Sequence, residues 1–295
     1  MSSHVLRARH VELTLSPAAP VLMGVVNASP ESFSDGGVYD TLDRQVARAQ
    51  QLVVEGAGII DVGGESGVTG MAPLDPDEEI GRVVPLVERL VAGGLIVSVD
   101  TWKPAVARAV LDAGAHIIND VSGLRDVGLA DACAASGAAL VVTHTRAEPK
   151  HKDFPDYVDV VADVVTLLRA RMATAAAHGM RAEQIVLDPG PDFAKTPAQT
   201  VDVLRHLDAV AALGRPVLLA VSRKDFIGAL TLRPPKERDA GTLAAVADGL
   251  DRGASILRVH DVGAVADFLA VRAALRGDRP VDADLHLPVE LRRQG

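Results

Sequence analysis

The chain has 295 residues, of which 48% are apolar and 23% charged, and 30 Lys and Arg against 39 Asp and Glu give a formal charge of −9. This is the composition of a soluble globular protein, and its acidic balance argues against a broad nucleic-acid-binding surface. No apolar run approaches the roughly 20 residues that span a bilayer, and we expect neither a membrane segment nor a secretory signal. The single cysteine, Cys133, cannot form an intrachain disulfide, which favours a reducing cytoplasm.

Short apolar runs alternate along the chain with longer amphipathic segments. Runs rich in Val, Ile and Leu are typical of parallel strands that are buried on both faces. The runs are VLMGVVN, GIIDVGGE, LIVSVD, HIIND, ALVVTH, QIVLD, PVLLAVS and SILRVH. Helices are predicted at 42–55, 78–90, 104–113, 157–178, 200–213, 242–252 and 264–275.

Eight strands with interleaved helices predict a single (β/α)8 barrel, a fold of typically about 250 residues. The alternative, a doubly wound open sheet, usually carries a GxGxxG loop after its first strand, and that motif is absent. We therefore expect an N-terminal extension at 1–20, a barrel domain at 21–276 and a polar, Pro-broken C-terminal tail at 277–295.

Polar side chains gather where the predicted strands end. They are Asn27, Asp61, Glu65, Asp100, Asn119, Asp120, His144, Asp188, Ser222, Arg223, Lys224, Arg258 and His260. In barrels of this kind, functional residues come from the C-terminal ends of several strands. The sequence therefore predicts a small-molecule site at that end.

These side chains are of two chemical kinds. Asp100, Asn119 and Asp188 supply hydrogen-bond acceptors, which suit a heterocycle rich in N–H groups. Lys224, Arg258 and His260 supply donors and positive charge, which suit phosphate oxygens or a developing anion. A ligand with a nitrogenous ring at one end and a phosphate at the other would use both sets.

Five of these residues also have simpler interpretations. Asp61 can be a helix cap or a loop ion pair, and Ser222 can cap the helix that follows it. His144 can be a buried structural histidine. Arg258 and His260 alternate, as the residues of any half-polar strand do.

The string VNASPESFSDGG resembles the signature N-x-T-P-D-S-F-S-D-G-G of the dihydropteroate synthase family. The resemblance continues in the family's order with DVGGES, SVDT, INDVSG, LDPGPDFAKT, VSRKDFIG and ILRVHD, from about residue 21 to 261. It implies a cytoplasmic, homodimeric (β/α)8 barrel and a transferase of folate biosynthesis. The implied reaction condenses (7,8-dihydropterin-6-yl)methyl diphosphate with 4-aminobenzoate, giving 7,8-dihydropteroate and diphosphate, with Mg²⁺ as the metal.

The resemblance also implies roles for individual residues. The pterin would be held by Asp100, Asn119, Asp188 and Lys224, and of these Asp100, Asp188 and Lys224 would be catalytic.

At the other end of the substrate, the resemblance assigns the diphosphate to Arg258 and His260. Asn27 would bind Mg²⁺ together with the diphosphate oxygens. Phe193 would line the aminobenzoate side, and Phe33 would lie in a first loop that covers the reacting centre.

The chain departs from the family pattern in three loops. Ser66-Gly67-Val68-Thr69-Gly70 replaces S-T-R-P-G, and Thr143-His144-Thr145 replaces M-H-M. The family pattern D-P-G-I-G-F-G-K is changed at three positions, which here are Pro191, Asp192 and Ala194.

The fourth departure is Asp225, which follows SRK where the family often has Ser or Arg to receive the aminobenzoate carboxylate. Two carboxylates within about 4–6 Å repel each other, so Asp225 predicts weaker binding of the aminobenzoate carboxylate at the acceptor side, where the amine substrate binds. In the alternative interpretation, Asp225 faces solvent in the first helical turn.

Three functions follow from these observations. The first is dihydropteroate synthase. The second is a related protein that binds the pterin diphosphate but uses another amine or is inactive as a synthase. The third is a pterin-dependent methyltransferase module, which SRK and RVHD disfavour because a methyl-folate has no diphosphate to neutralise.

Overall fold

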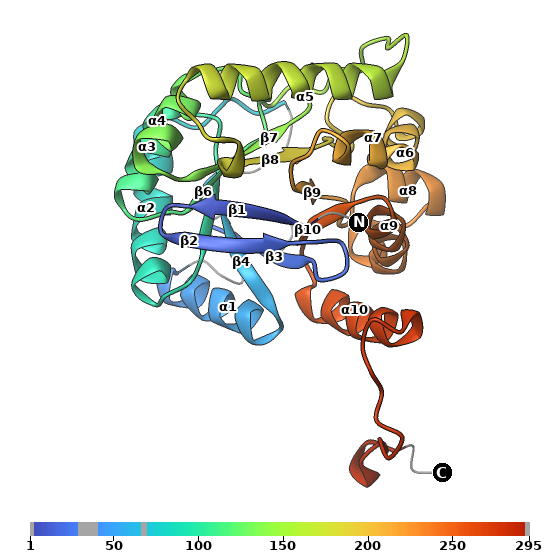
Figure 1. The fold of residues 1–295 in the computed structure, drawn as a ribbon. Coiled ribbons are helices and arrows are strands. Elements are labelled where there is room, and N and C mark those ends of the chain that lie inside the picture. The colour runs from blue at the N-terminus through green and yellow to red at the C-terminus, as the bar shows by residue number, and fades with distance from the viewer. Residues whose placement is uncertain (1–2, 29–40, 66–69, 293–295) are drawn as a thin grey trace.

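The structure is a computed structural model that describes residues 3–28, 41–65 and 70–292. Its centre is a closed parallel barrel in the order β10-β3-β4-β5-β6-β7-β8-β9 (Figure 1). The strands are β3 (Val21–Asn27), β4 (Ala57–Gly63), β5 (Val97–Asp100), β6 (Ile117–Asp120), β7 (Ala139–Thr143), β8 (Ile185–Asp188), β9 (Val217–Leu219) and β10 (Ala254–Val259). Each predicted apolar run overlaps one of these strands, and the predicted (β/α)8 barrel is confirmed.

Helices surround the barrel (Figure 1). They are α1 (Leu42–Val54), α2 (Pro76–Ala92), α3 (Pro104–Asp112), α4 (Gly128–Ser136), α5 (Val160–Ala177), α6 (Pro197–Arg205), α7 (Leu207–Ala211), α8 (Asp225–Thr231), α9 (Asp239–Asp251) and α10 (Val262–Arg276). Short 3₁₀ turns are η1 (Ala182–Gln184), η2 (Pro235–Glu237) and η3 (Val289–Leu291). The single helix predicted at 200–213 was wrong, because the helix is interrupted at His206 and forms two helices, α6 and α7.

The helix α4 was not predicted, and α8 was expected after Ser222 without bounds. The α4 sequence GLADACAAS consists mostly of small apolar residues, so it shows little of the helical periodicity on which the other predictions depend. The α8 helix has only 7 residues. By contrast, α6 begins with a capping box, in which Thr196 and Gln199 each accept a hydrogen bond from the other's backbone N–H.

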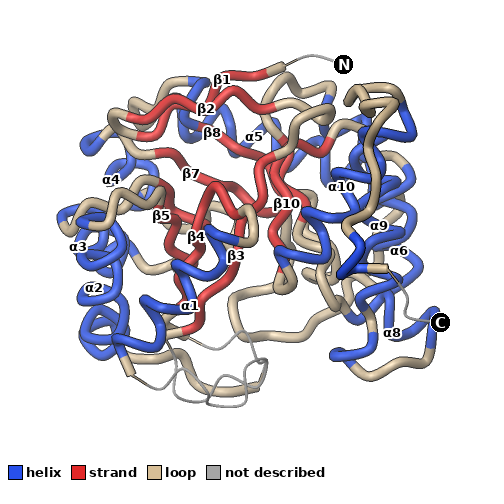
Figure 2. Tube along the Cα trace, turned by 90° about the horizontal axis from the view of Figure 1, so that it is seen from below, coloured by secondary structure: helices blue, strands red, loops and turns tan. Residues whose placement is uncertain are grey.

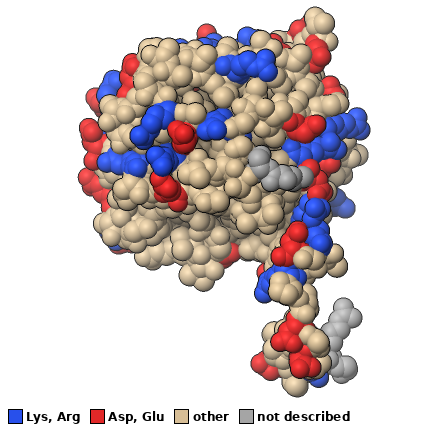
Figure 3. Space-filling model, in the orientation of Figure 1, with Lys and Arg blue, Asp and Glu red and all other residues tan. Residues whose placement is uncertain are grey.

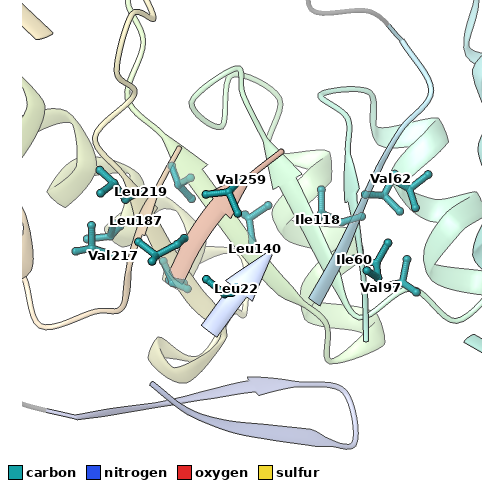
Figure 4. Close-up of a cluster of buried hydrophobic side chains, with 14 of the residues drawn as sticks. Leu22, Ile60, Val62, Val97, Ile118, Leu140, Leu187, Val217, Leu219 and Val259 are labelled. Atoms are coloured by element: carbon teal, nitrogen blue, oxygen red, sulfur yellow. The ribbon is translucent and has the colours of Figure 1, made fainter. Parts of the chain in front are cut away.

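The core has two layers, separated by the barrel wall. Met23, Ile59 and Ile117 belong to the cluster inside the barrel. Their chain neighbours Leu22 and Ile60 belong to the cluster between strands and helices, part of which Figure 4 shows. Since successive side chains of a strand point to opposite faces, burial on both faces explains the unbroken apolar runs.

A hairpin of β1 (His4–Ala8) and β2 (Val11–Leu15) lies outside the barrel wall. The sequence predicts no strand there. Leu6, Ala8 and Leu15 are fully buried and join the cluster inside the barrel. The hairpin thus covers the N-terminal end of the barrel, and the strands run away from it toward the opposite end (Figures 1 and 2).

The hairpin face carries Lys and Arg interspersed with Asp and Glu rather than one extended basic surface (Figure 3). Among the described residues, no helix is both long and apolar enough to cross a bilayer.

Candidate functional site

The carboxyl ends of neighbouring strands bring a group of acceptor side chains together. Asp100 ends β5 and is in register with Asn119 on β6, while Thr143 on β7 is in register with Asp188 on β8. Asp61 lies on β4, whose Gly63 is in register with Asp100. Pairing of adjacent parallel strands therefore places these predicted residues along one rim of the barrel.

Arg258 on β10 reaches into this group. Its Nε donates to Asp61 Oδ2 at 2.7 Å and one terminal nitrogen donates to Asp100 Oδ2 at 3.2 Å. Asn119 Nδ2 also donates to Asp61 Oδ2, at 3.2 Å. Asp61 is fully buried on a strand, so its interpretation as a helix cap was wrong, and its ion pair joins two strands rather than lying in a loop. The sequence signal for a buried, paired Asp61 was its place within the apolar run GIIDVGGE, because acidic residues are rarely buried unless they are paired.

Two buried acceptor oxygens in this group have no protein hydrogen-bond partner within the part of the chain that the structure describes. They are Asp61 Oδ1 and Asn119 Oδ1. Leaving a buried acceptor without a donor costs about 1–3 kcal/mol, so these oxygens call for N–H groups from a ligand. Burial also raises the pKa of the Asp100 carboxyl to about 7, against the opposing attraction of Arg258.

The neighbouring strand ends combine an acceptor, a cation and an aromatic ring. Asp188 Oδ1 accepts from the backbone N–H of Gly190 at 2.7 Å. Lys224 Nζ lies 4.3 Å from the centre of the Phe193 ring. Burial raises the pKa of Asp188 and lowers that of Lys224, whose ammonium Asp192 and Asp188 favour. The structure thus brings the predicted residues Asp188, Phe193 and Lys224 together.

His260 lies beside a polar cavity of about 260 Å³ at the junction of β3, β10 and α1. The cavity is lined by Val25, Asn27, Arg48, Glu55, Arg223, His260 and Asp261. Ser222 Oγ accepts the backbone N–H of His260 and lies 2.9 Å from its Nδ1. Ser222 does not cap α8, whose N-cap residue is Lys224, so that interpretation was wrong.

The two residues predicted for the diphosphate have different surroundings. Arg258 is bound between carboxylates of the acceptor group, whereas His260 shares its cavity with Asn27. Burial, reinforced by the positive charge of Arg258, lowers the pKa of His260 to about 4. His260 is therefore a neutral N–H donor near pH 7 rather than a cation.

His144 is a structural residue, one of the two interpretations that the sequence left open. Its ring is fully buried and lies 2.8 Å from Asp163 Oδ1 through Nε2 and 2.8 Å from Lys195 Nζ through Nδ1. Burial, helped by the charge of Lys195, lowers the pKa of His144 to about 3, so the ring stays neutral.

Asp120 and Glu65 are also structural. Asp120 accepts backbone N–H groups of Ser122 and Leu124 in the turn that follows β6. Glu65 pairs with Lys103 at 2.7 Å and with Lys150 at 3.0 Å. These contacts anchor loops around the site. Phe33 and the altered loop positions 66–69 lie outside the described residues.

Asp225, the fourth departure, is the first residue of α8, and its side chain is 69% exposed. Its carboxylate lies 3.2 Å from a terminal nitrogen of Arg238 and 3.7 Å from Lys152 Nζ. The backbone N–H of Phe226 is accepted instead by Asp192 Oδ2, at 3.2 Å. Asp225 thus faces solvent with its charge partly offset, and Asp192 brings a second carboxylate to the same helix end.

A closed parallel barrel whose open rim combines buried acceptors with adjacent cations defines an enzyme barrel for a polar heterocyclic ligand. Comparison with known proteins gives the class, because residues 23–260 match the family described as pterin binding enzyme.

The chain is 42% identical over 257 residues to dihydropteroate synthase of Bacillus subtilis (strain 168), covering 86% of this chain and 88% of that protein. Xanthomonas albilineans dihydropteroate synthase, solved with 4-aminobenzoic acid, matches with a TM-score of 0.85 and 43% identity over 93% of this chain and 99% of that one. Burkholderia cenocepacia dihydropteroate synthase, solved with 7,8-dihydropteroate, matches with a TM-score of 0.85 and 38% identity, covering 94% of this chain and 99% of that one.

The chain belongs to the dihydropteroate synthase family. The predicted function, a transferase of the pterinylmethyl group in folate biosynthesis, is thereby confirmed.

Proposed function

We propose that the rim of the barrel binds (7,8-dihydropterin-6-yl)methyl diphosphate and joins its methylene carbon to the amine of 4-aminobenzoate. The observation that carries the proposal is the pair of buried acceptor oxygens, on Asp61 and Asn119, that lack partners among the described residues. A dihydropterin ring presents the N–H groups that such oxygens need. The relatives solved with 4-aminobenzoic acid and 7,8-dihydropteroate support the same substrates.

At the pterin end, Asp100, Asn119 and Asp188 accept hydrogen bonds from the ring. Their positions on adjacent strands give the ring one orientation, because each oxygen is fixed by a strand end. Lys224 adds a buried donor next to Asp188, above the Phe193 ring.

At the leaving-group end, Arg258 and His260 donate to the diphosphate oxygens. Arg258 then exchanges part of its contact with Asp100 for contact with the diphosphate. His260 donates through a ring N–H, and the approach of an anion raises its pKa from the low value that burial imposes.

The donor set beside His260 fits a Mg²⁺ ion that arrives with the diphosphate. Asn27 offers an amide oxygen at the cavity, and Mg²⁺ usually takes few protein ligands besides phosphate oxygens and water. The described residues contain no cluster of three or more His, Cys, Asp or Glu that could hold a metal ion by itself. When bound, Mg²⁺ would neutralise charge on the departing diphosphate.

The reaction exchanges one bond at the methylene carbon for another. The carbon–oxygen bond breaks and its electron pair leaves with the diphosphate, while the amine nitrogen forms the new carbon–nitrogen bond and loses a proton. Positive charge that develops on the pterinylmethyl group is stabilised by the carboxylates of Asp100 and Asp188. The protein needs no nucleophile of its own for this reaction, because the amine of the substrate is the nucleophile.

The acceptor side carries a second candidate function. Phe193 offers a ring surface for an aromatic amine, but Asp225 and Asp192 both bring carboxylates to the start of α8. This arrangement favours an amine without a carboxylate, so a synthase that uses another acceptor is the alternative.

We further propose that the chain works in the cytoplasm as a homodimer, with residues 21–276 as the catalytic domain after an N-terminal extension at 1–20. Residues 277–295 would be a tail that activity does not require. Sedimentation of the full chain tests the dimer, and activity after truncation at 276 tests the tail.

The deciding experiment incubates the protein with the pterin diphosphate, Mg²⁺ and 4-aminobenzoate, and measures released diphosphate and 7,8-dihydropteroate. Equal amounts of both products are expected. Pterin binding without dihydropteroate would support the alternative acceptor, and a panel of uncharged arylamines would then identify its class. No pterin binding would refute the proposal.

A further inference from the structure

Lys195 is a buried cation that the proposed reaction does not use. Its residue is only 1% exposed, and it is the largest of the fully buried side chains in the described part of the barrel. Its Nζ donates to the carbonyl oxygens of Gly190 at 2.9 Å and Phe193 at 3.1 Å. The third close partner is His144 Nδ1, at 2.8 Å.

These three close partners match the three donors of an ammonium group, and the carbonyl oxygen of His144, at 3.4 Å, is a more distant fourth acceptor. His144 stays neutral, and its other nitrogen, Nε2, lies 2.8 Å from Asp163 Oδ1, so the ring proton belongs on Nε2 and Nδ1 is left as an acceptor. Asp163 is itself held by two nitrogens of Arg146. An ammonium has three N–H groups and satisfies all three acceptors, whereas a neutral amine has two and leaves one acceptor without a donor.

The segment that Lys195 holds has an unfavourable backbone. Asp192 and Ala194 have φ of 63° and 52°, a left-handed conformation that costs non-glycine residues roughly 1–2 kcal/mol. Gly190 has φ of 65° in the same segment. Such a conformation persists only where the surroundings fix it, and here Tyr157 Oη also donates to the carbonyl of Ala194 at 2.9 Å.

The same segment shapes two parts of the site. The N–H of Gly190 holds the carboxylate of Asp188, and the ring of Phe193 lies beneath the ammonium of Lys224. A shift of the 189–194 backbone would therefore move Asp188 on the pterin side and Phe193 on the acceptor side together.

We propose that Lys195 is a positioning residue, which fixes the 189–194 segment through Gly190 and Phe193 so that Asp188 and Lys224 keep their geometry toward the substrates. Its effect on catalysis rests on the proposed function. Its effect on the segment does not, because the contacts exist without substrate.

Charged groups from several elements face this ammonium. Asp188 on β8, Asp163 on α5 and Asp192 in the segment favour the charged form. Burial and Lys224 oppose it, and they lower the pKa of Lys195 to about 7. The neutral imidazole of His144 completes the surroundings. Turnover is therefore expected to fall as pH rises from 7 to 9, because the third acceptor then loses its donor.

The test compares Lys195→Met and Lys195→Arg with the exposed control Lys236→Met. In Lys195→Met we expect amide hydrogen exchange at Gly190, Asp192 and Phe193, the hydrogen-bonded N–H groups of the segment, to quicken at least tenfold while β8 is unchanged. We also expect a kcat at least tenfold lower and loss of the alkaline limb of the pH profile. Lys195→Arg should restore part of the protection and of kcat, and the control should match the unmodified protein.

The proposal is overturned if folded Lys195→Met keeps normal exchange in 189–194, or keeps normal kcat and the same pH profile. If Lys195→Met does not fold, the pH dependence of amide protection in the unmodified protein decides instead. Protection of this segment, measured relative to the base-catalysed intrinsic exchange rate, that does not fall above pH 7 would then contradict the proposal. A chain that makes no dihydropteroate but shows the expected exchange would refute the proposed function alone.

Discussion

The guanidinium of Arg258 on β10 is bound to the fully buried carboxylate of Asp61 on β4 at 2.7 Å, past β3, which lies between the two strands. This pair links Arg258, which is predicted to bind the diphosphate, to the group of hydrogen-bond acceptors at the pterin end. A substrate that occupies both ends therefore meets a guanidinium that Asp61 holds in place, while the contact with Asp100 is the one it can exchange. Pre-arranged charges of this kind stabilise a transition state without reorganising during the reaction.

Asp61→Asn tests whether that pair organises the mouth. Removing one partner of a buried ion pair costs about 3–5 kcal/mol because the other charge is left uncompensated, and Asp100 should keep the loss near the lower end. We expect denaturant unfolding to show a loss of about 3 kcal/mol and calorimetry to show weaker binding of the pterin diphosphate.

The matched control for Asp61→Asn is Glu12→Gln, which breaks the exposed Arg7–Glu12 pair of the hairpin. Exposed pairs contribute about 0–1 kcal/mol, so this change should be nearly neutral. Similar losses in the two variants would show that the buried pair has no special role.

Asp100 predicts a pH dependence of pterin binding. Its pKa is about 7, and only the ionised carboxylate accepts N–H groups through both oxygens. Affinity should therefore be full above pH 8 and fall as pH drops through 7, to about one tenth at pH 6, where roughly a tenth of the carboxyl remains ionised. Calorimetry of the pterin diphosphate across this range measures it. In Asp100→Asn binding should be weak at every pH, and a flat profile in the unmodified protein would contradict the assignment.

Gly190→Ala tests the backbone that carries Asp188. The residue has φ of 65°, and a Cβ there would overlap the carbonyl oxygen of His144. Gly214 has φ of 77° but open space around it, so Gly214→Ala isolates the conformational cost, about 1–2 kcal/mol. We expect Gly190→Ala to lose clearly more stability in denaturant titration and to lose pterin affinity as well. Equal losses would show that the close approach to His144 does not matter.

The barrel could be predicted because apolar runs and amphipathic segments alternate regularly in the local sequence. The partners of the polar side chains could not, because they depend on strands distant in sequence. Asp61 and Arg258 are separated by 197 positions, and only closure of β10 against β3 brings them near each other. The contact of Ser222 with His260 and that of Lys195 with His144 were missed for the same reason, since the partners are 38 and 51 positions apart.

Asp225→Ser tests the acceptor side. Asp225 is exposed and partly offset by Arg238 and Lys152, so its repulsion of a nearby carboxylate is modest, about 1 kcal/mol. We expect the KM for 4-aminobenzoate to fall about fivefold, because 1.4 kcal/mol corresponds to a factor of ten. The KM for the pterin diphosphate should stay unchanged, since Asp225 contacts none of the acceptors that face the ring.

The matched control is Asp43→Ser, because Asp43 is likewise an exposed acid in a first helical turn, paired with Arg89 at 3.3 Å. Steady-state kinetics with each substrate varied in turn separates the two KM values. If Asp225→Ser and Asp43→Ser leave the KM for 4-aminobenzoate equally unaffected, the two neighbouring cations already cancel the charge of Asp225. The altered residue then leaves acceptor choice unchanged, and the case for another amine rests on Asp192 alone.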